Sequence, residues 1–408
     1  MNQKEKNIGQ LRWLYLIVGT VAMLFAGIIY AWSILKTPFV TEFQWSTTNL
    51  ALNFTLTMSF FCIGGLLGAN LAKRIGSTLT VMISGLVVAA GFILTSRLTG
   101  DSVLFLYFTY GGLAGIGIGI SYNVVIGTVN AWFPDKKGLC SGCLMMGFGA
   151  SALLLGSTAS SMFESTIGWR NTYVILGVVL GVVLILAAMI LKRPGADDIL
   201  PVAKGSNSHK NHEFEQKDYT TSEMLRRPSF WMAFICLICL AAVGSSVISF
   251  ARDLAISVDA PLTLATTLVG VLSICNGIGR ILTGVAFDVF GRRKTMLAAN
   301  LLTIVAASTI LVAVIVKSVP ICVIGLCLTG LSYGSCPTTT ATFVSTFYGM
   351  KYFSTNMAIM TFNLMGGSFI ATLSSTLLSI SGGYIVPFIM LLCLSSIAFV
   401  LNLLVRHP

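Results

Sequence analysis

One basic residue, Arg280, lies inside a long apolar run of this sequence, eight residues before Asp288 at the end of that run. A helix rises about 1.5 Å per residue, so the guanidinium would lie roughly 12 Å from the end of the run. An arginine near the centre of a bilayer costs about 2.5–3.5 kcal/mol on insertion scales. No Asp, Glu or His occurs deep within any apolar run of the chain. We therefore expect an arriving anion to supply the missing negative charge.

Arg280 and Asn276 together have the chemistry of a carboxylate site. A guanidinium is planar and always charged, and it donates two parallel hydrogen bonds to a carboxylate. Asn276 precedes Arg280 by four residues, so both side chains lie on one face of a helix. Its amide can donate to the second oxygen of the ligand or to a hydroxyl group. The alternative is that Arg280 packs against helix carbonyls or extends its charged end to the membrane surface.

The elements that must position this site are membrane-spanning helices. The chain has 408 residues, of which 55% are hydrophobic and 10% are charged. A soluble domain carries about 25% charged residues, so the composition excludes soluble globular, disordered and nucleic-acid-binding proteins. Apolar runs of about 20 residues are typical of helices that cross a bilayer. The sequence predicts an all-α membrane protein with twelve such helices, at 13–35, 49–72, 78–96, 103–127, 139–162, 172–191, 229–251, 262–287, 295–316, 320–346, 354–378 and 384–405.

The basic residues predict how these helices are oriented. If the N-terminus is inside, the inside segments carry 19 of the 25 Lys and Arg residues and the outside segments carry 5, with Arg280 left over. Cytoplasmic loops of membrane proteins are enriched in Lys and Arg. We therefore expect both termini to be cytoplasmic, and we expect the net charge of +11 to reflect orientation rather than a nucleic-acid partner.

The chain divides into two similar halves. The longest polar stretch, 192–228, separates six apolar runs from six. We expect an N-terminal bundle over 1–191, a cytoplasmic linker over 192–228 and a C-terminal bundle over 229–408. A shift of 215 residues superimposes Gly76 on Gly291. Parallel six-helix repeats about an axis along the membrane normal are typical of transporters with a binding site at the midplane.

The segment that follows the eighth apolar run closely resembles a loop motif of the major facilitator superfamily. In that motif a glycine, an aspartate, a second glycine and a basic cluster follow at fixed spacing. The matching residues are Gly284, Asp288, Gly291, Arg292 and Arg293. In the superfamily the acidic residue helps to latch the cytoplasmic side. The first half departs from the motif, with Ala69 for the glycine and Lys73 for the acid, so the resemblance does not imply a symmetric latch.

Two further segments resemble one branch of this superfamily, the oxalate/formate antiporters and monocarboxylate transporters. The segment 130–142 is similar to a long loop signature of that branch, and it contains the gating candidates Asp135 and Lys136. Asn276-Gly277-Ile278-Gly279-Arg280 and Tyr30-Ala31-Trp32 are similar to its shorter motifs. The resemblance implies that Arg280 binds the substrate carboxylate. It also nominates three site tyrosines, Tyr122, Tyr30 and Tyr333, whose alternative role is packing between helices.

The eleventh apolar run favours one class of anion over another. Oxalate exchangers of this family hold a second cation there, a lysine, whereas 356–366 has none and offers only Asn363 at membrane depth. One fixed positive charge neutralises a monoanion. A missing cation at about 4 Å is worth about 4 kcal/mol at an effective dielectric constant of 20. We therefore expect a monocarboxylate such as lactate, pyruvate or formate, with Asn363 as a further substrate-binding candidate that could instead bond between helices.

These observations predict a monomeric secondary transporter of the plasma membrane that works by alternating access. Exchange of one anion for another is favoured, because an empty Arg280 site is costly to move through the bilayer. Proton symport and oxalate:formate-type antiport are the alternatives, and a transporter-like sensor is the alternative of a different class. The spans lack paired carboxylates and a nucleophile–base pair, and no Walker loop occurs, so we expect neither an enzyme nor a cofactor.

A glycine-rich face marks the fourth apolar run, with Gly111, Gly112, Gly115, Gly117 and Gly119. It follows no strand, so a dinucleotide-binding loop is not expected. Small residues allow membrane helices to approach closely. We expect this face to pack against neighbouring helices.

Overall fold

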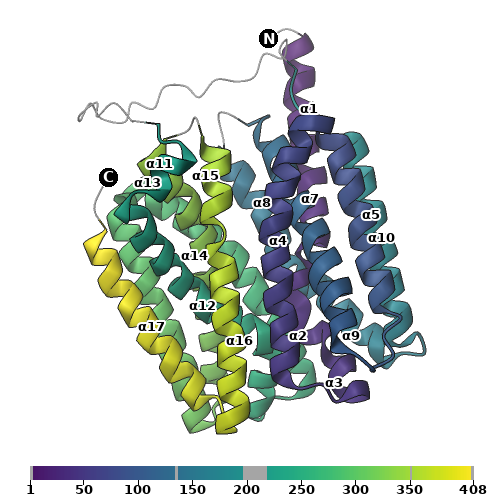
Figure 1. Cartoon of the computed structure of the whole chain (residues 1–408), viewed down its shortest axis with the longest axis vertical. Helices are drawn as coiled ribbons and strands as arrows, with labels where there is room; N and C mark the ends of the chain where they lie inside the picture. The colour runs from purple at the N-terminus through teal and green to yellow at the C-terminus, as the bar shows by residue number, and fades with distance from the viewer. Residues whose placement is uncertain (1–2, 134–136, 196–217, 350–351, 406–408) are drawn as a thin grey trace.

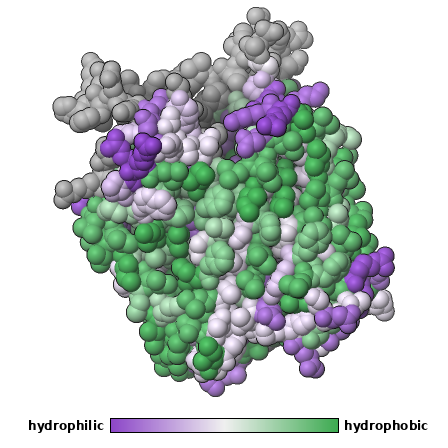
Figure 2. Space-filling model, in the orientation of Figure 1, coloured by the Kyte–Doolittle hydropathy of each residue, from purple (hydrophilic) through white to green (hydrophobic). Residues whose placement is uncertain are grey.

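The computed structural model describes residues 3–133, 137–195, 218–349 and 352–405, and all regular structure in these ranges is helical. Twelve of its helical segments are long and apolar enough to cross a membrane. Each corresponds to one predicted run, so the prediction of an all-α protein with twelve spans is confirmed. Figure 2 shows an apolar band around the middle of the molecule, with polar residues gathered at its two ends.

The first six spans are built from α1 to α10. Span 1 contains α1, a 3-10 turn η1, α2 and α3, and span 4 contains α6, a π-helical turn η2 and α7. Their bounds are α1 Gln3–Ala26, η1 Gly27–Ala31, α2 Trp32–Leu35, α3 Thr37–Phe43, α4 Thr47–Ile75, α5 Ser77–Thr95, α6 Val103–Leu106, η2 Tyr107–Ala114, α7 Gly115–Asn130, α8 Lys137–Ser151, η3 Ala152–Gly156, α9 Ser157–Glu164 and α10 Gly168–Ile190.

The last six spans follow a short helix, α11. Span 11 is interrupted between α15 and α16, and α13 contains two spans. Their bounds are α11 Thr221–Leu225, α12 Pro228–Ser257, α13 Leu262–Val316, α14 Val319–Tyr348, α15 Phe353–Met360, α16 Asn363–Ser381 and α17 Ile385–Leu404. In Figure 1 the first six spans, purple to blue, lie beside the last six, green to yellow.

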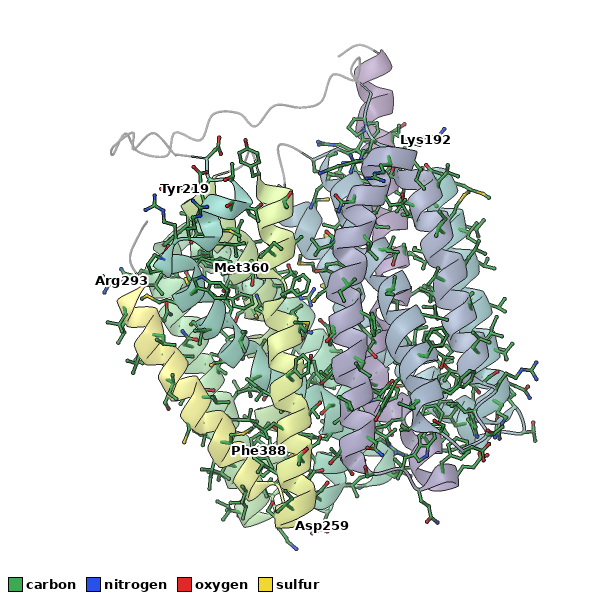
Figure 3. The ribbon with its side chains drawn as sticks, in the orientation of Figure 1. Lys192, Tyr219, Asp259, Arg293, Met360 and Phe388 are labelled. Carbon is green, nitrogen blue, oxygen red and sulfur yellow. The ribbon has the colours of Figure 1, made fainter. Side chains whose placement is uncertain are left out.

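The two ends of the molecule can be told apart by labelled residues. Lys192, Tyr219 and Arg293 lie at the end toward which both chain termini run, whereas Asp259 lies at the other end (Figure 3). We call the first end the terminal face and the second the far face. The distribution of Lys and Arg along the sequence predicts that the terminal face is cytoplasmic.

The glycine-rich face of span 4 packs closely on both sides, as expected. A Cβ on Gly119 would overlap the backbone carbonyl of Phe61 on α4, and one on Gly115 would lie 2.8 Å from the Thr57 oxygen. A Cβ on Gly117 would lie 2.9 Å from the Val88 nitrogen on α5. Span 4 therefore holds α4 and α5 together by backbone contact, and this positions Tyr122 near the middle of α7.

Two glycines end equivalent spans in a conformation that other residues rarely adopt. Gly291 has φ 74° and ψ 171° and divides α13 into spans 8 and 9. Gly76 has φ 85° and ψ 162° and divides α4 from α5. Their spacing of 215 residues is the predicted repeat interval. At either position an added Cβ would meet nothing within 4 Å. A side chain is therefore disfavoured by the local backbone conformation itself and not by contacts with neighbouring residues.

We expect Gly291→Ala to lower the free energy of unfolding by about 1–3 kcal/mol, the cost of an alanine in this region. The comparison variant is Gly383→Ala, whose added Cβ also meets nothing within 4 Å and whose φ is not in the positive range. Thermal unfolding of both purified variants in detergent measures the difference. Equal melting temperatures for the two variants would contradict the argument.

Candidate functional site

Arg280 lies on α13 with only 3% of its surface exposed. Its Nε donates to Asn276 Oδ1 at 3.4 Å, and its Nη2 donates to the Tyr30 hydroxyl at 3.2 Å. Its Nη1 has no hydrogen-bond partner within the described part of the chain. No carboxylate pairs with it there, because the ion pairs found among these residues join Lys36 to Asp253 and Arg170 to Glu42. The positive charge is buried and uncompensated by the described residues, as the sequence predicts.

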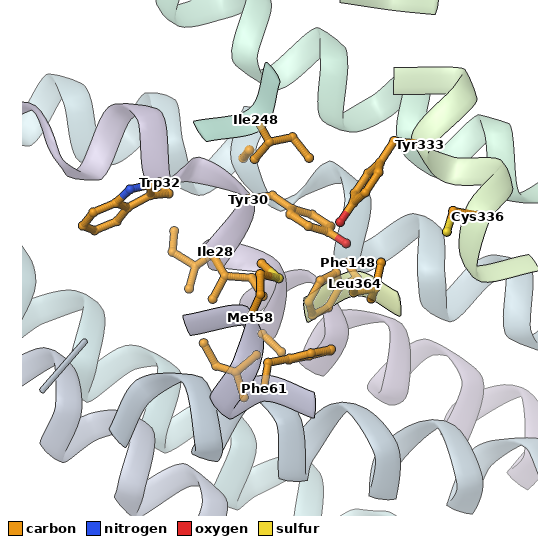
Figure 4. Close-up of a cluster of buried hydrophobic side chains, with 14 of the residues drawn as sticks. Ile28, Tyr30, Trp32, Met58, Phe61, Phe148, Ile248, Tyr333, Cys336 and Leu364 are labelled. Atoms are coloured by element: carbon orange, nitrogen blue, oxygen red, sulfur yellow. The ribbon is translucent and has the colours of Figure 1, made fainter. Parts of the chain in front are cut away.

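Three tyrosines surround this guanidinium, brought there from three different spans. Tyr30 comes from the 3-10 turn η1 of span 1, where the change in helical pitch coincides with the site. Its ring lies edge-on to that of Tyr333 from α14, with centroids 6.0 Å apart. Figure 4 shows the hydroxyls of these two rings directed toward the same space. Tyr122 from α7 lies close enough to Arg280 to interact with its charge.

Several buried hydrogen-bond donors in this cluster have no partner among the described residues. They are Nη1 of Arg280, Nδ2 of Asn276 and the hydroxyl of Tyr333. An unsatisfied buried polar group costs about 1–3 kcal/mol, and native proteins contain few of them. Three unpartnered donors in one cluster, one of them charged, have the chemistry needed to hold the oxygens of a small carboxylate.

Apolar rings wall the same space. The ring of Phe148 lies 5.2 Å from that of Tyr30 and 5.1 Å from that of Tyr122, centroid to centroid. Phe61 stacks edge-on against Tyr122 at 5.1 Å. A ligand here would contact hydrogen-bond donors on one side and aromatic carbon on the other. This arrangement suits an anion with a short hydrocarbon part.

A cavity of about 490 Å³ lies between the first and last six spans and reaches the terminal face. Tyr122 and Asn363 line it at membrane depth, and Lys73 and Arg193 line it near the terminal face. Arg280 does not line the cavity, whereas Tyr122, which interacts with its charge, does.

Asn363 is placed differently from the other predicted site residues. It is the first residue of α16, directly after the interruption of span 11. Its Nδ2 donates to Thr340 Oγ1 at 3.0 Å, and its Oδ1 accepts from the Cys336 thiol at 3.7 Å. The amide is therefore bonded to α14, which is the helix–helix role that the sequence left open. It still lines the cavity, but no hydrogen bond joins it to Arg280.

The far face is closed by contacts that sequence reasoning missed. Lys36 follows α2, its side chain is 4% exposed, and its Nζ lies 2.7 Å from Asp253 Oδ2 on α12. The same ammonium donates to the Ser249 carbonyl at 3.0 Å. Next to it, Arg252 donates to Thr37 Oγ1 at 3.0 Å. Thr37 and Arg252 are 215 residues apart, so equivalent ends of the two repeats meet here.

Lys36 is one of the five basic residues in the segments that the sequence predicts to lie outside. In the structure it is buried between spans 1 and 7. The sequence does place a positive charge, Lys36, after the first apolar run and a negative charge, Asp253, after the seventh. Only the fold shows that the ends of these two runs touch.

The gating candidates are only partly described. Gly284 is half-buried, and an added Cβ would lie 3.9 Å from Thr338 Cγ2. Gly291 forms the break in α13, and Arg293 is exposed at the terminal face. Asp135 and Lys136, and the side chains of Asp288 and Arg292, lie outside what the structure describes.

Comparison with known proteins matches the whole chain to one family. The profile of the Major Facilitator Superfamily matches residues 14–252 and 237–408. The oxalate:formate antiporter of Oxalobacter formigenes is 27% identical over 395 residues, which cover 96% of this chain and 90% of that protein. Monocarboxylate transporter 2 of Mesocricetus auratus is 28% identical over 171 residues, 40% of this chain and 34% of that protein.

The fold is also similar to a solved structure. A bacterial homologue of the human lysosomal transporter Spinster, in an inward-facing and occupied conformation, superimposes with a TM-score of 0.69 at 16% identity. The match covers 97% of this chain and 96% of that one. At this identity the likeness concerns the fold alone.

Proposed function

The chain belongs to the Major Facilitator Superfamily, and from this premise we propose that it is a secondary transporter of small monocarboxylates. Its relatives are membrane transporters and not enzymes, and its twelve apolar spans make it a multi-pass membrane protein. The observation that carries the proposal is the buried, uncompensated guanidinium of Arg280 with its unpartnered Nη1. A carboxylate would accept from this group and from Asn276 Nδ2, and would cancel the charge.

Charge balance supports a monoanion as the substrate. Arg280 is the cation at the centre of the site, while Lys36 is paired with Asp253 at the far face. A dianion would keep one negative charge uncompensated, which is worth about 4 kcal/mol at about 4 Å and an effective dielectric constant of 20. The proposed substrates are therefore lactate, pyruvate, formate or a 2-hydroxy acid, whose hydroxyl could accept from Tyr333.

Alternating access supplies the transport cycle in this proposal. The bundles 1–191 and 229–408, joined by the linker 192–228, rock about the Arg280 site. The described conformation has a cavity toward the terminal face and polar contacts across the far face. With cytoplasmic termini, as the basic residues predict, this is a conformation open to the cytoplasm. The protein acts as a monomer in the plasma membrane, and it needs no cofactor.

The proposed coupling mode is the exchange of one anion for another. Proton symport is the alternative, and the counterflow experiment below distinguishes the two. A bound carboxylate neutralises Arg280, whereas an empty site must move a buried charge. No Asp, Glu or His contacts Arg280 within the described ranges, so no protein carboxylate there is placed to carry a proton with the substrate.

Counterflow in proteoliposomes tests this proposal. Vesicles loaded with unlabelled lactate are expected to take up labelled lactate at least tenfold faster than empty vesicles, because the loaded site crosses more readily. Formate and pyruvate are tested in the same way. Uptake into empty vesicles driven by a pH gradient alone, at the same rate, would contradict exchange and favour proton symport. Absence of flux for every carboxylate would contradict the transporter proposal itself.

A further inference from the structure

The mouth of the cavity differs in charge from its deep end. Among its described lining residues only Lys73 and Arg193 are charged, and both are positive. No Asp or Glu is found among the residues of the lining that the structure describes. The other polar groups that line it are amides, hydroxyls and a thiol. A small anion that enters from the terminal face therefore meets two cations before it reaches Tyr122.

Neither cation is neutralised by a residue that the structure describes. Both side chains are exposed, and neither forms an ion pair within the described residues. Lys73 stands in the last turn of α4, at the position where the superfamily motif has an acid. This departure from the motif removes a latch acid and places an ammonium on the wall of the cavity.

The backbone next to Arg193 is anchored by a specific hydrogen bond. The indole Nε1 of Trp132, a residue with 3% exposure, donates to the backbone carbonyl of Lys192 at 2.6 Å. This bond fixes the segment after α10 against the end of α7. The guanidinium then lies over α7, with Nη2 4.0 Å from the point where a Cβ on Gly127 would be. The backbone that carries Arg193 is thereby fixed beside the cavity, which the residue lines.

We infer that Lys73 and Arg193 form a second anion position at the cavity mouth, which a small carboxylate occupies on its way to or from Arg280. This inference rests on the proposed function. Tyr122 and Asn130 both line the cavity, and the rise along α7 from one to the other is about 12 Å. The mouth is therefore a position separate from the Arg280 cluster, and its two exposed cations are screened by salt more strongly than a buried charge is.

The predicted consequence is confined to one face of the protein. A positive cleft raises the local anion concentration and the rate of association, and salt abolishes the effect. The Lys73→Gln/Arg193→Gln double variant should therefore raise KM for substrate offered at the terminal face by about tenfold at about 0.01 M salt. The difference should vanish near 1 M salt, where the Debye length is about 3 Å. KM at the far face should not change, because both cations line the cavity near the terminal face.

Oriented proteoliposomes of neutral lipid, with lactate as the probe, provide the measurement. Arg74→Gln and Lys192→Gln are the matched controls, because both residues are exposed neighbours that do not line the cavity. Melting temperatures verify that all variants fold. If the wild type transports lactate and the double variant has the same KM at the terminal face, the inference is overturned and the proposed function stands. If the wild type transports no carboxylate, the proposed function is overturned.

An anionic lipid headgroup carries the same chemistry as a carboxylate and could occupy the two cations instead. The measurement is therefore repeated in vesicles that contain anionic lipid. Substrate binding at the mouth predicts the KM difference in neutral lipid. A difference that appears only with anionic lipid would assign Lys73 and Arg193 to the membrane and would overturn the inference.

Discussion

Replacing Arg280 by glutamine is expected to reduce lactate counterflow by about 10²- to 10³-fold. The substitution removes the charge that balances the carboxylate, and truncating one partner of a buried hydrogen-bonded charge pair costs about 3–5 kcal/mol. Removal of the charge also leaves Tyr30 and Asn276 without their hydrogen bonds to the guanidinium. Initial rates of exchange in proteoliposomes measure the loss.

Arg280→Lys separates charge from geometry in the same assay. Lysine keeps the positive charge but lacks the planar fork, so it cannot donate two parallel hydrogen bonds to a carboxylate. We expect it to retain more activity than Arg280→Gln and less than the wild type. Arg97→Gln is the matched control, because Arg97 is exposed at the end of span 3 and does not line the cavity. Wild-type exchange rates for Arg280→Gln would contradict a site at this residue.

The second large effect is expected at the far face, where Asp253→Asn should favour the conformation open to that side. The substitution leaves the ammonium of Lys36 buried without its carboxylate. Because Asp253 is 42% exposed, we expect about 2–3 kcal/mol rather than the full cost of a buried pair, or roughly a 30- to 150-fold shift in the conformational equilibrium. Distances between spin labels at Thr41 and Asp259, with Cys393 replaced, measure the opening.

Two companion variants test the assignment to this ion pair. In the double variant Lys36→Met/Asp253→Leu no charge is left unpaired, so closure of the far face should be restored. Glu42→Gln breaks the other ion pair of the described chain, in which both partners are at least 40% exposed, and it should have little effect. If Asp253→Asn and the double variant open the far face equally, the unpaired ammonium is not the cause.

The sequence predicts features that depend on one segment at a time. The twelve spans follow from local hydropathy, because a helix must satisfy its own backbone in lipid. The break at Gly291 follows from its repeat relation to Gly76. The isolation of Arg280 follows because the runs contain no acid that any fold could bring to it. The structure agrees with each of these predictions.

The features that the sequence does not predict depend on which spans meet. Lys36 and Asp253 are 217 residues apart, and their burial exists only because the far ends of spans 1 and 7 touch. The sequence leaves open whether the amide of Asn363 binds substrate or bonds between helices, and the fold brings Thr340 and Cys336 of α14 to that amide. The sequence places Lys73 at a known position of the loop motif. Its place on the cavity wall depends on how the two halves pack, because residues of both halves line the cavity.

The most direct test of the central claim is a ligand-induced thermal shift with a panel of small carboxylates, carried out on the wild type and on Arg280→Ala. A ligand that binds only the folded state raises the melting temperature by mass action. We expect formate, lactate or pyruvate to stabilise the wild type more than oxalate does, and we expect Arg280→Ala to lose the shift. An equal shift in Arg280→Ala would contradict the claim that this guanidinium binds the anion.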